Sequence, residues 1–190
     1  MADPTPRCVL IRHGETEWSL DGRHTGRTDI PLLPDGEIQA QALRSVLSGC
    51  TFATVLSSPL IRARDTAALA GLGRAVVEPD LAEWDYGAYE GLTTSQIRQE
   101  RPGWDLFTDG VPGGESAADV ARRVDRVIAR IRTVPGDVAC VAHSHVLRVF
   151  AVRWIGLDPS VGRNLVLDPA AYGELGWDRE CPVIRSWNRR

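Results

Sequence analysis

The first chemically informative segment lies near the start of the chain, where an apolar run ends in Arg12, His13 and Gly14. Residues 8–11 read Cys-Val-Leu-Ile and predict a buried strand. The guanidinium of Arg12 matches phosphate oxygens, and a neutral imidazole such as that of His13 can attack phosphorus. Gly14 would let a ligand approach the backbone. These residue types predict a site that binds and attacks a phosphoryl group.

Four further segments accompany residues 12–16 (Arg-His-Gly-Glu-Thr) in order along the chain. They read Gly-Arg-His-Thr-Gly at 22–26, Ser-Ser-Pro-Leu-Ile-Arg-Ala-Arg at 57–64, Leu-Ala-Glu-Trp-Asp-Tyr-Gly-Ala-Tyr-Glu-Gly at 81–91 and Val-Ala-His-Ser-His at 141–145. Together these five segments resemble the motifs of the histidine phosphatase superfamily, which includes phosphoglycerate mutases and many acid and sugar phosphatases. A single short motif often matches by chance, but five in order do not.

The resemblance implies a role for each of five catalytic residues. Arg12 and Arg62 would hold the phosphoryl oxygens and neutralise charge in the transition state. His13 would be the nucleophile and become a phosphohistidine, and His143 would donate to a phosphoryl oxygen. Glu83 would protonate the departing oxygen and then deprotonate the attacking water.

Two of these assignments have neighbours of the same chemical type. Arg64 competes with Arg62, and the family motif favours Arg62. Asp85 and Glu90 compete with Glu83 as the acid, and the motif favours Glu83.

Four residues correspond to phosphate or substrate contacts in the family. Ser19, Thr25 and Gly26 take such positions, although an ordinary role as turn residues is equally open. Ser144 stands where glycine is common after the second histidine, and it adds a hydroxyl close to the phosphate.

Within the superfamily, the motifs look most like those of small acid phosphatases and sedoheptulose-bisphosphatase-like sugar phosphatases. The implied activity is hydrolysis of small phosphorylated metabolites, sugar phosphates among them. The alternative is a phosphoglycerate mutase, but the stretch 83–114 is short and its only basic residues are Arg98 and Arg101. A second alternative, a non-catalytic relative that binds phosphorylated ligands, is disfavoured because all five catalytic residues are present.

Three histidines also allow a metal site to be considered. On an extended segment His143 and His145 would face the same side, and His13 would complete a set of three imidazoles. Arg12 and Arg62 would repel a dication at that position. We therefore predict a reaction without a metal or another cofactor.

Strand and helix patterns alternate along the chain. The apolar runs 8–11, 54–57 and 138–142 predict strands, and helical spacing predicts helices over 36–47, 116–131 (with Ser116 as its N-cap) and 146–155 (closed by Gly156). This alternation favours a mostly parallel sheet with helices on both faces, whose ligands bind beyond the carboxyl ends of the strands. The fold predicted is a three-layer α/β/α sandwich, phosphoglycerate mutase-like, forming one domain over residues 1–190.

The sequence also predicts the structure of two further segments. Residues 172–177 and 183–187 predict an antiparallel hairpin at the sheet edge. The segment 103–114, rich in glycine, proline and tryptophan, predicts an ordered loop that arches over the site.

Composition limits the partners and the compartment. The chain has 190 residues, 43% of them hydrophobic, and a formal charge of −3, which argues against a broad nucleic-acid or membrane surface. No signal peptide or membrane-spanning run is evident, and Cys8, Cys50, Cys140 and Cys181 form no metal or redox motif. We expect a cytoplasmic monomer or homodimer that acts on a small-molecule phosphomonoester.

Overall fold

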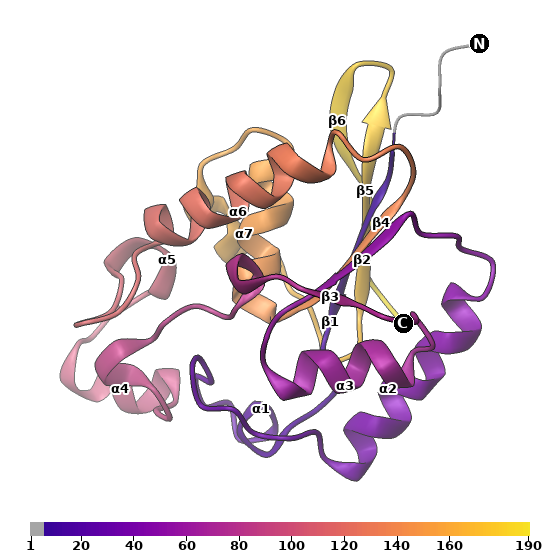
Figure 1. Ribbon diagram of the computed structural model, residues 1–190. Coiled ribbons are helices and arrows are strands. Elements are labelled where there is room, and N and C mark those ends of the chain that lie inside the picture. Colours follow the sequence, from indigo (N-terminus) through magenta and orange to yellow (C-terminus); the bar gives the residue numbers. More distant parts are fainter. Residues whose placement is uncertain (1–5) are drawn as a thin grey trace.

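The computed structural model describes residues 6–190, with a six-stranded sheet at its centre (Figure 1). Its strands are β1 (Cys8–Arg12), β2 (Thr54–Ser57), β3 (Val76–Val77), β4 (Val138–Ala142), β5 (Tyr172–Asp178) and β6 (Cys181–Arg189). They lie in the order β3-β2-β4-β1-β5-β6. The first four of that order are parallel, while β5 and β6 form an antiparallel hairpin at the edge. The mostly parallel sheet and its edge hairpin were both predicted correctly.

Helices cover both faces of the sheet (Figure 1). Helices α2 (Pro34–Leu47) and α3 (Ile61–Leu69) pack on one face, and α6 (Ala117–Ile131) and α7 (Ser144–Trp154) pack on the other. Successive side chains of a strand point to opposite faces, so Leu10 of β1 joins the α6 and α7 core and Ile11 joins the α2 and α3 core. The three-layer α/β/α architecture is confirmed.

Helix α6 begins where its sequence predicted. The hydroxyl of Ser116 accepts the main-chain N–H of Asp119, and the Asp119 carboxylate accepts the N–H of Ser116. This capping box satisfies two of the N–H groups left free at a helix start. The helix then buries Val120, Val124 and Val127 against the sheet.

Helix α7 begins earlier than predicted, at Ser144, with His143 as its N-cap. The assumption that residues 143–145 are extended is therefore wrong, because the first helical turn already includes His145. The helix ends at Trp154, and Gly156 adopts a φ of +75° just beyond it, as expected for a residue that closes a helix.

The segment 103–114 is not an arching loop. It contains a one-turn helix, α5 (Leu106–Asp109), and Trp104 and Phe107 are buried in the core beside α6 and α7. Its aromatic residues therefore serve packing.

Several other short elements lacked a clear periodic signal: α1 (Glu17–Leu20), α4 (Thr94–Glu100), and the 3₁₀ helices η1 (Pro79–Leu81), η2 (Gly87–Tyr89) and η3 (Pro159–Asn164).

Candidate active site

The proposed catalytic residues meet at the carboxyl ends of the parallel strands. Arg12 ends β1 and His13 follows it, Ser58 follows β2, and His143 follows β4. A cavity of about 250 Å³ opens at this edge. Its walls consist of Arg12, His13, Ser19, Gly22, Arg23, His24, Thr25, Glu83, Tyr86, Thr94, Ser144 and His145.

The ring of His13 is buried and held in one orientation. Its Nδ1 lies 2.6 Å from the carbonyl oxygen of Gly14. Since a carbonyl only accepts, Nδ1 must carry the proton, which leaves a lone pair on Nε2. Burial lowers the pKa of His13 well below its usual 6.5, and the charges of Arg62 and Arg12 lower it further. His13 is therefore a neutral imidazole with a nucleophilic nitrogen.

His143 lies beside His13, with 5.1 Å between the ring centroids. The Nε of Arg62 donates to Nδ1 of His143 at 3.2 Å, so the proton of this imidazole is on Nε2. That nitrogen lies 2.7 Å from the Oγ of Ser58. Burial is also the main cause that lowers the pKa of His143 well below 6.5. The arrangement leaves His143 neutral and able to donate through Nε2.

Arg62 is fully buried at the start of α3, whereas its competitor Arg64 is exposed. Besides its bond to His143, its guanidinium donates to the carbonyl oxygens of Thr25 (3.0 Å), Gly26 (3.1 Å) and Thr28 (2.9 Å). An arginine keeps its charge even when burial lowers its pKa, as it does here. Arg62 thus brings a positive charge to the two histidines and fixes the loop 25–28.

Arg12, at the end of β1, brings a second guanidinium to the site and is partly buried. Its Nη1 donates to the carbonyl oxygen of Leu167 at 2.6 Å. Its Nε is buried but has no partner among residues 6–190. A buried donor without an acceptor is costly in a folded protein. An anion in the adjoining cavity would supply that acceptor.

The carboxylate of Glu83 lies at the start of α7. It accepts the main-chain N–H groups of Trp84 (2.9 Å), His145 (3.1 Å) and Val146 (2.9 Å). The last two are helix N–H groups with no partner inside the helix. The helix therefore fixes the position of this carboxylate in the cavity wall.

The two competing carboxylates are engaged elsewhere. Asp85 forms an ion pair with Arg27 at 2.7 Å, and Glu90 accepts the N–H groups of Gly26 and Thr28. Neither lines the cavity. Of the three acids in the segment, only Glu83 reaches it.

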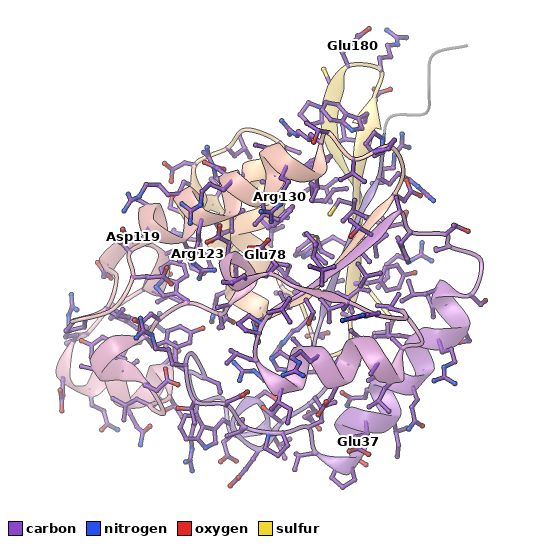
Figure 2. The ribbon with its side chains drawn as sticks, viewed as in Figure 1. Glu37, Glu78, Asp119, Arg123, Arg130 and Glu180 are labelled. Atoms are coloured by element: carbon purple, nitrogen blue, oxygen red, sulfur yellow. The ribbon has the colours of Figure 1, made fainter. Side chains whose placement is uncertain are left out.

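Arg123 of α6 holds the main chain around Glu83. It donates to the carbonyl oxygens of Asp80 (2.7 Å), Ala82 (2.6 Å) and Glu83 (3.2 Å), and twice to the carboxylate of Glu115 (2.8 and 3.0 Å). All five N–H groups of the guanidinium are therefore used. In Figure 2, Arg123 lies on α6 facing the segment that follows β3. Sequence patterns gave no reason to select it.

The four expected substrate contacts divide into two groups. Ser19, Thr25 and Ser144 line the cavity. Gly26 does not, because its N–H is bound to Glu90 and its carbonyl oxygen accepts from Arg62. A Cβ at position 26 would lie 2.5 Å from the Trp84 carbonyl oxygen, so glycine is needed there for close packing.

Two aromatic cavity residues, His24 and Tyr86, were not singled out from the sequence, and a third, His145, was considered only as a metal ligand. The hydroxyl of Tyr86 lies 2.6 Å from Nδ1 of His145, and the His145 and His24 rings stack at 6.0 Å. Burial lowers the pKa of both imidazoles. The sequence signal that could have identified these residues as site residues was their position within the family motifs. They form a neutral, polar part of the cavity wall.

Within residues 6–190, no group of three or more His, Cys, Asp or Glu side chains is arranged to hold a metal. His143 and His145 do not share a ligand position, because the first faces Ser58 and the second faces Tyr86. The three-imidazole arrangement considered from the sequence is therefore not formed. The same part of the chain contains no helix with the length and apolar character needed to cross a bilayer.

Comparison with known proteins decides the family. The model of the histidine phosphatase superfamily (branch 1) matches residues 8–190. This chain belongs to that superfamily. The resemblance read from the five motifs is thus confirmed, and this histidine phosphatase is an enzyme of the phosphoglycerate mutase-like fold.

Several relatives of this histidine phosphatase have named activities. An acid phosphatase of Mycobacterium tuberculosis is 42% identical over 90% of this chain and 87% of its own length. A sedoheptulose 1,7-bisphosphatase of Saccharomyces cerevisiae is 37% identical over 83% of this chain and 70% of its own. A 2,3-bisphosphoglycerate-dependent phosphoglycerate mutase of Gloeobacter violaceus is 30% identical over 80% and 76%.

The fold comparison agrees with the sequence comparison. A solved structure of an open reading frame of Mycobacterium tuberculosis superposes with a TM-score of 0.93, at 39% identity, over 97% of each chain. The named phosphatases are consistent with a phosphomonoesterase of small phosphorylated metabolites.

Proposed function

We propose that this histidine phosphatase hydrolyses phosphomonoesters of small metabolites, sugar phosphates among them, through a phosphohistidine on His13. The observation that carries the proposal is the orientation of His13, whose Nδ1 lies 2.6 Å from the carbonyl oxygen of Gly14, which leaves a lone pair on Nε2. Burial and the charges of Arg62 and Arg12 keep this imidazole neutral. Relatives named acid phosphatase and sedoheptulose bisphosphatase support this substrate class.

In the first step, Nε2 of His13 forms a bond to phosphorus while the bond from phosphorus to the leaving oxygen breaks. Arg12 offers its unpartnered Nε to a phosphoryl oxygen, Arg62 adds positive charge, and His143 turns its Nε2–H from Ser58 to the phosphoryl group. Glu83 gives its proton to the leaving oxygen.

In the second step, water replaces the released alcohol. Glu83, now ionised, takes a proton from the water while the water oxygen bonds to phosphorus and the bond to Nε2 of His13 breaks. Inorganic phosphate leaves, and His13 returns to the neutral form. The three N–H groups that bind the Glu83 carboxylate keep it in place in both steps.

A screen of phosphate release across a panel of phosphomonoesters, ranked by kcat/KM, tests the proposal. The panel combines sugar phosphates, polyol phosphates, nucleotides and p-nitrophenyl phosphate, with His13→Ala as the inactive control. We expect small sugar phosphates to rank first. If the wild-type protein binds these esters but releases no phosphate from any of them, the chain is a non-catalytic binder and the proposal is wrong.

Mutase activity is the second candidate, because a phosphoglycerate mutase is among the relatives. Interconversion of 3- and 2-phosphoglycerate, with and without 2,3-bisphosphoglycerate, separates the two activities. We expect phosphate release to exceed interconversion, because the stretch 83–114 contributes few basic residues. Faster interconversion than release would make the mutase the main activity.

We also propose a cytoplasmic location and action as a single domain without nucleic acid. All four cysteines are free, and the Sγ atoms of Cys8 and Cys140 lie 3.9 Å apart in neighbouring strands, a hydrogen-bond contact between thiols and not a disulfide. Free thiols are typical of a reducing compartment.

A further inference from the structure

A second cavity adjoins the reaction cavity. It has a volume of about 140 Å³ and lies among α4, α5, α7 and η3. His24, Thr94 and His145 line both cavities, so the two share a wall. A small ligand that starts at His13 and passes these three residues would end in the second cavity.

Three guanidiniums line the second cavity, from Arg98 on α4, Arg148 on α7 and Arg163 on η3. Across residues 6–190, none of the three forms an ion pair. The one acidic residue in the wall is Asp105, whose carboxylate caps α5 by accepting the N–H of Phe107 at 2.9 Å. The cavity therefore carries a net positive charge.

Arg148 is held in place before any ligand arrives. Its Nε and Nη2 each donate at 2.9 Å, to the carbonyl oxygens of Gly162 and Arg163. Its guanidinium also lies 4.7 Å from the ring centre of Phe107. Neither interaction neutralises its charge. A fixed, unpaired cation binds an anion with little loss of side-chain entropy.

The position of Arg148 sets the separation of the two sites. It follows His145 by three residues on α7, which places their Cβ atoms about 5–6 Å apart on the same side of the helix. Because Glu83 caps the start of α7, the second site lies about one helical turn beyond the reaction centre. A small sugar can span that separation.

The shared wall suits a neutral, hydroxylated linker. Nδ1 of His24 lies 2.9 Å from the carbonyl oxygen of Leu92, so it carries the proton and Nε2 is an acceptor. The His24 and His145 rings are nearly parallel, with an interplanar angle of 12°. Neutral imidazoles and the hydroxyl of Thr94 offer hydrogen bonds to sugar hydroxyls without attracting the phosphate itself.

We propose that the second cavity binds a second phosphate group, at the far end of the substrate from the bond that is cleaved. The preferred substrates are then bisphosphate esters of small sugars. Three unpaired guanidiniums match the double charge and the terminal oxygens of a phosphate better than a single carboxylate. This inference rests on the proposed function, since it extends the same site.

The test compares fructose 1,6-bisphosphate with fructose 1-phosphate and fructose 6-phosphate. In the wild-type enzyme we expect kcat/KM for the bisphosphate to exceed that for either monophosphate by about tenfold or more, the usual effect of a charge-assisted hydrogen bond. In the double variant Arg98→Gln/Arg163→Gln this ratio should fall towards one. Arg74→Gln removes an exposed arginine outside both cavities and should leave the ratio at the wild-type value.

Three results would overturn the second phosphate site. The first is a wild-type kcat/KM for the bisphosphate that is no higher than for the monophosphates. The second is a higher kcat/KM for the bisphosphate that the double variant retains. The third is an enzyme that does not prefer the bisphosphate but prefers 3-phosphoglycerate to glycerol 3-phosphate, and loses this preference in the double variant. The last result would indicate a carboxylate site.

Binding to the His13→Ala protein separates this inference from the proposed function. Calorimetric titration should show tighter binding of fructose 1,6-bisphosphate than of fructose 6-phosphate, and the difference should shrink when Arg98 and Arg163 are also replaced. This measurement needs no turnover. Absence of phosphate release by the wild type would therefore count against the proposed function, while equal binding of the two esters would count against the second site.

Discussion

Arg123 and Glu83 are joined through the main chain, with Nη2 of the arginine 3.2 Å from the carbonyl oxygen of the glutamate. The carboxylate of the same Glu83 caps α7. The proposed acid is therefore fixed at its backbone by one helix and at its side chain by another. Its placement depends on α6 as much as on the cavity.

Replacing Arg123 should lower kcat without a matching rise in KM. Arg123→Gln leaves three carbonyl oxygens and the Glu115 carboxylate with fewer donors, so the main chain around Glu83 should be held less firmly. We expect kcat to fall about 10- to 100-fold, since small misplacements of a catalytic group are costly. Arg123→Lys should not restore activity, because an ammonium lacks the planar fork. Steady-state kinetics with a sugar phosphate measures both values.

Arg130 provides the matched control for Arg123. It lies on the same helix and pairs with Glu78 (Figure 2), outside the cavity, so Arg130→Gln should keep the wild-type kcat. An equal fall in kcat in both variants would indicate a general effect on α6 and would remove the positioning role of Arg123.

His13→Ala should abolish the phosphoenzyme and lower turnover by about 10³-fold or more, as loss of a nucleophile typically does. Rapid quenching with ³²P-labelled substrate at neutral or alkaline pH should trap an acid-labile, base-stable label on the wild type. His145→Gln, a change at another cavity histidine, should still be labelled. Equal labelling of the His13→Ala protein would show that another residue is the nucleophile.

Glu83→Gln should affect substrates according to their leaving group. General acid catalysis is worth about 10²–10⁴-fold, so we expect a loss of that size with a sugar phosphate and a smaller loss in the phosphorylation step with p-nitrophenyl phosphate. Asp85→Asn is the control, because Asp85 lies outside the cavity and pairs with Arg27. Leaving-group dependence in Asp85→Asn alone would assign the acid to Asp85.

Exhaustive chelation should leave kcat essentially unchanged. In the proposed mechanism, two guanidiniums and the Nε2–H of His143 supply the charge stabilisation that a metal ion provides in other phosphatases. Activity with a sugar phosphate is measured after dialysis against a chelator and again after each divalent ion is added back. Recovery with one specific ion after a complete loss would require a metal in the mechanism.

The free energy of unfolding should decrease as the pH falls below about 6.5. Burial lowers the pKa values of His13, His143 and His145 well below 6.5 in the folded protein. In this range the unfolded chain binds protons that the folded chain does not, so each such histidine costs up to about 1.4 kcal/mol per pH unit. Urea unfolding at pH 7.5, 6.5 and 5.5 should show the trend, and His145→Gln should make it shallower. A pH dependence identical in wild type and variant would argue against this histidine as a source.

The layered fold was predictable because the strands and long helices have strong periodic patterns. The runs 54–57 and 138–142 match β2 and β4 residue for residue, and Ser116 caps α6. Shorter elements were not predictable in this way. Helix α5 has only one turn, which is too short to show a periodic pattern in the sequence. The segment around it is stabilised by burial of Trp104 and Phe107 in the core.

Residues at strand ends were predictable as site residues, since a parallel sheet brings its carboxyl ends together. His13 and His143 illustrate this. The supporting contacts were not predictable, because they join residues far apart in the chain. Arg148 and Arg163 reach the second cavity from α7 and η3, so considering only the stretch 83–114 missed two of its three basic residues.

The bond between the Glu83 carboxylate and α7 has a spectroscopic consequence. In the proposed mechanism Glu83 loses and regains a proton, so the amide protons of His145 and Val146 would gain and lose a charged acceptor. Their NMR chemical shifts should therefore follow the protonation of Glu83 directly. In isotope-labelled protein, these two backbone amides would then report which step of the proposed cycle the enzyme occupies.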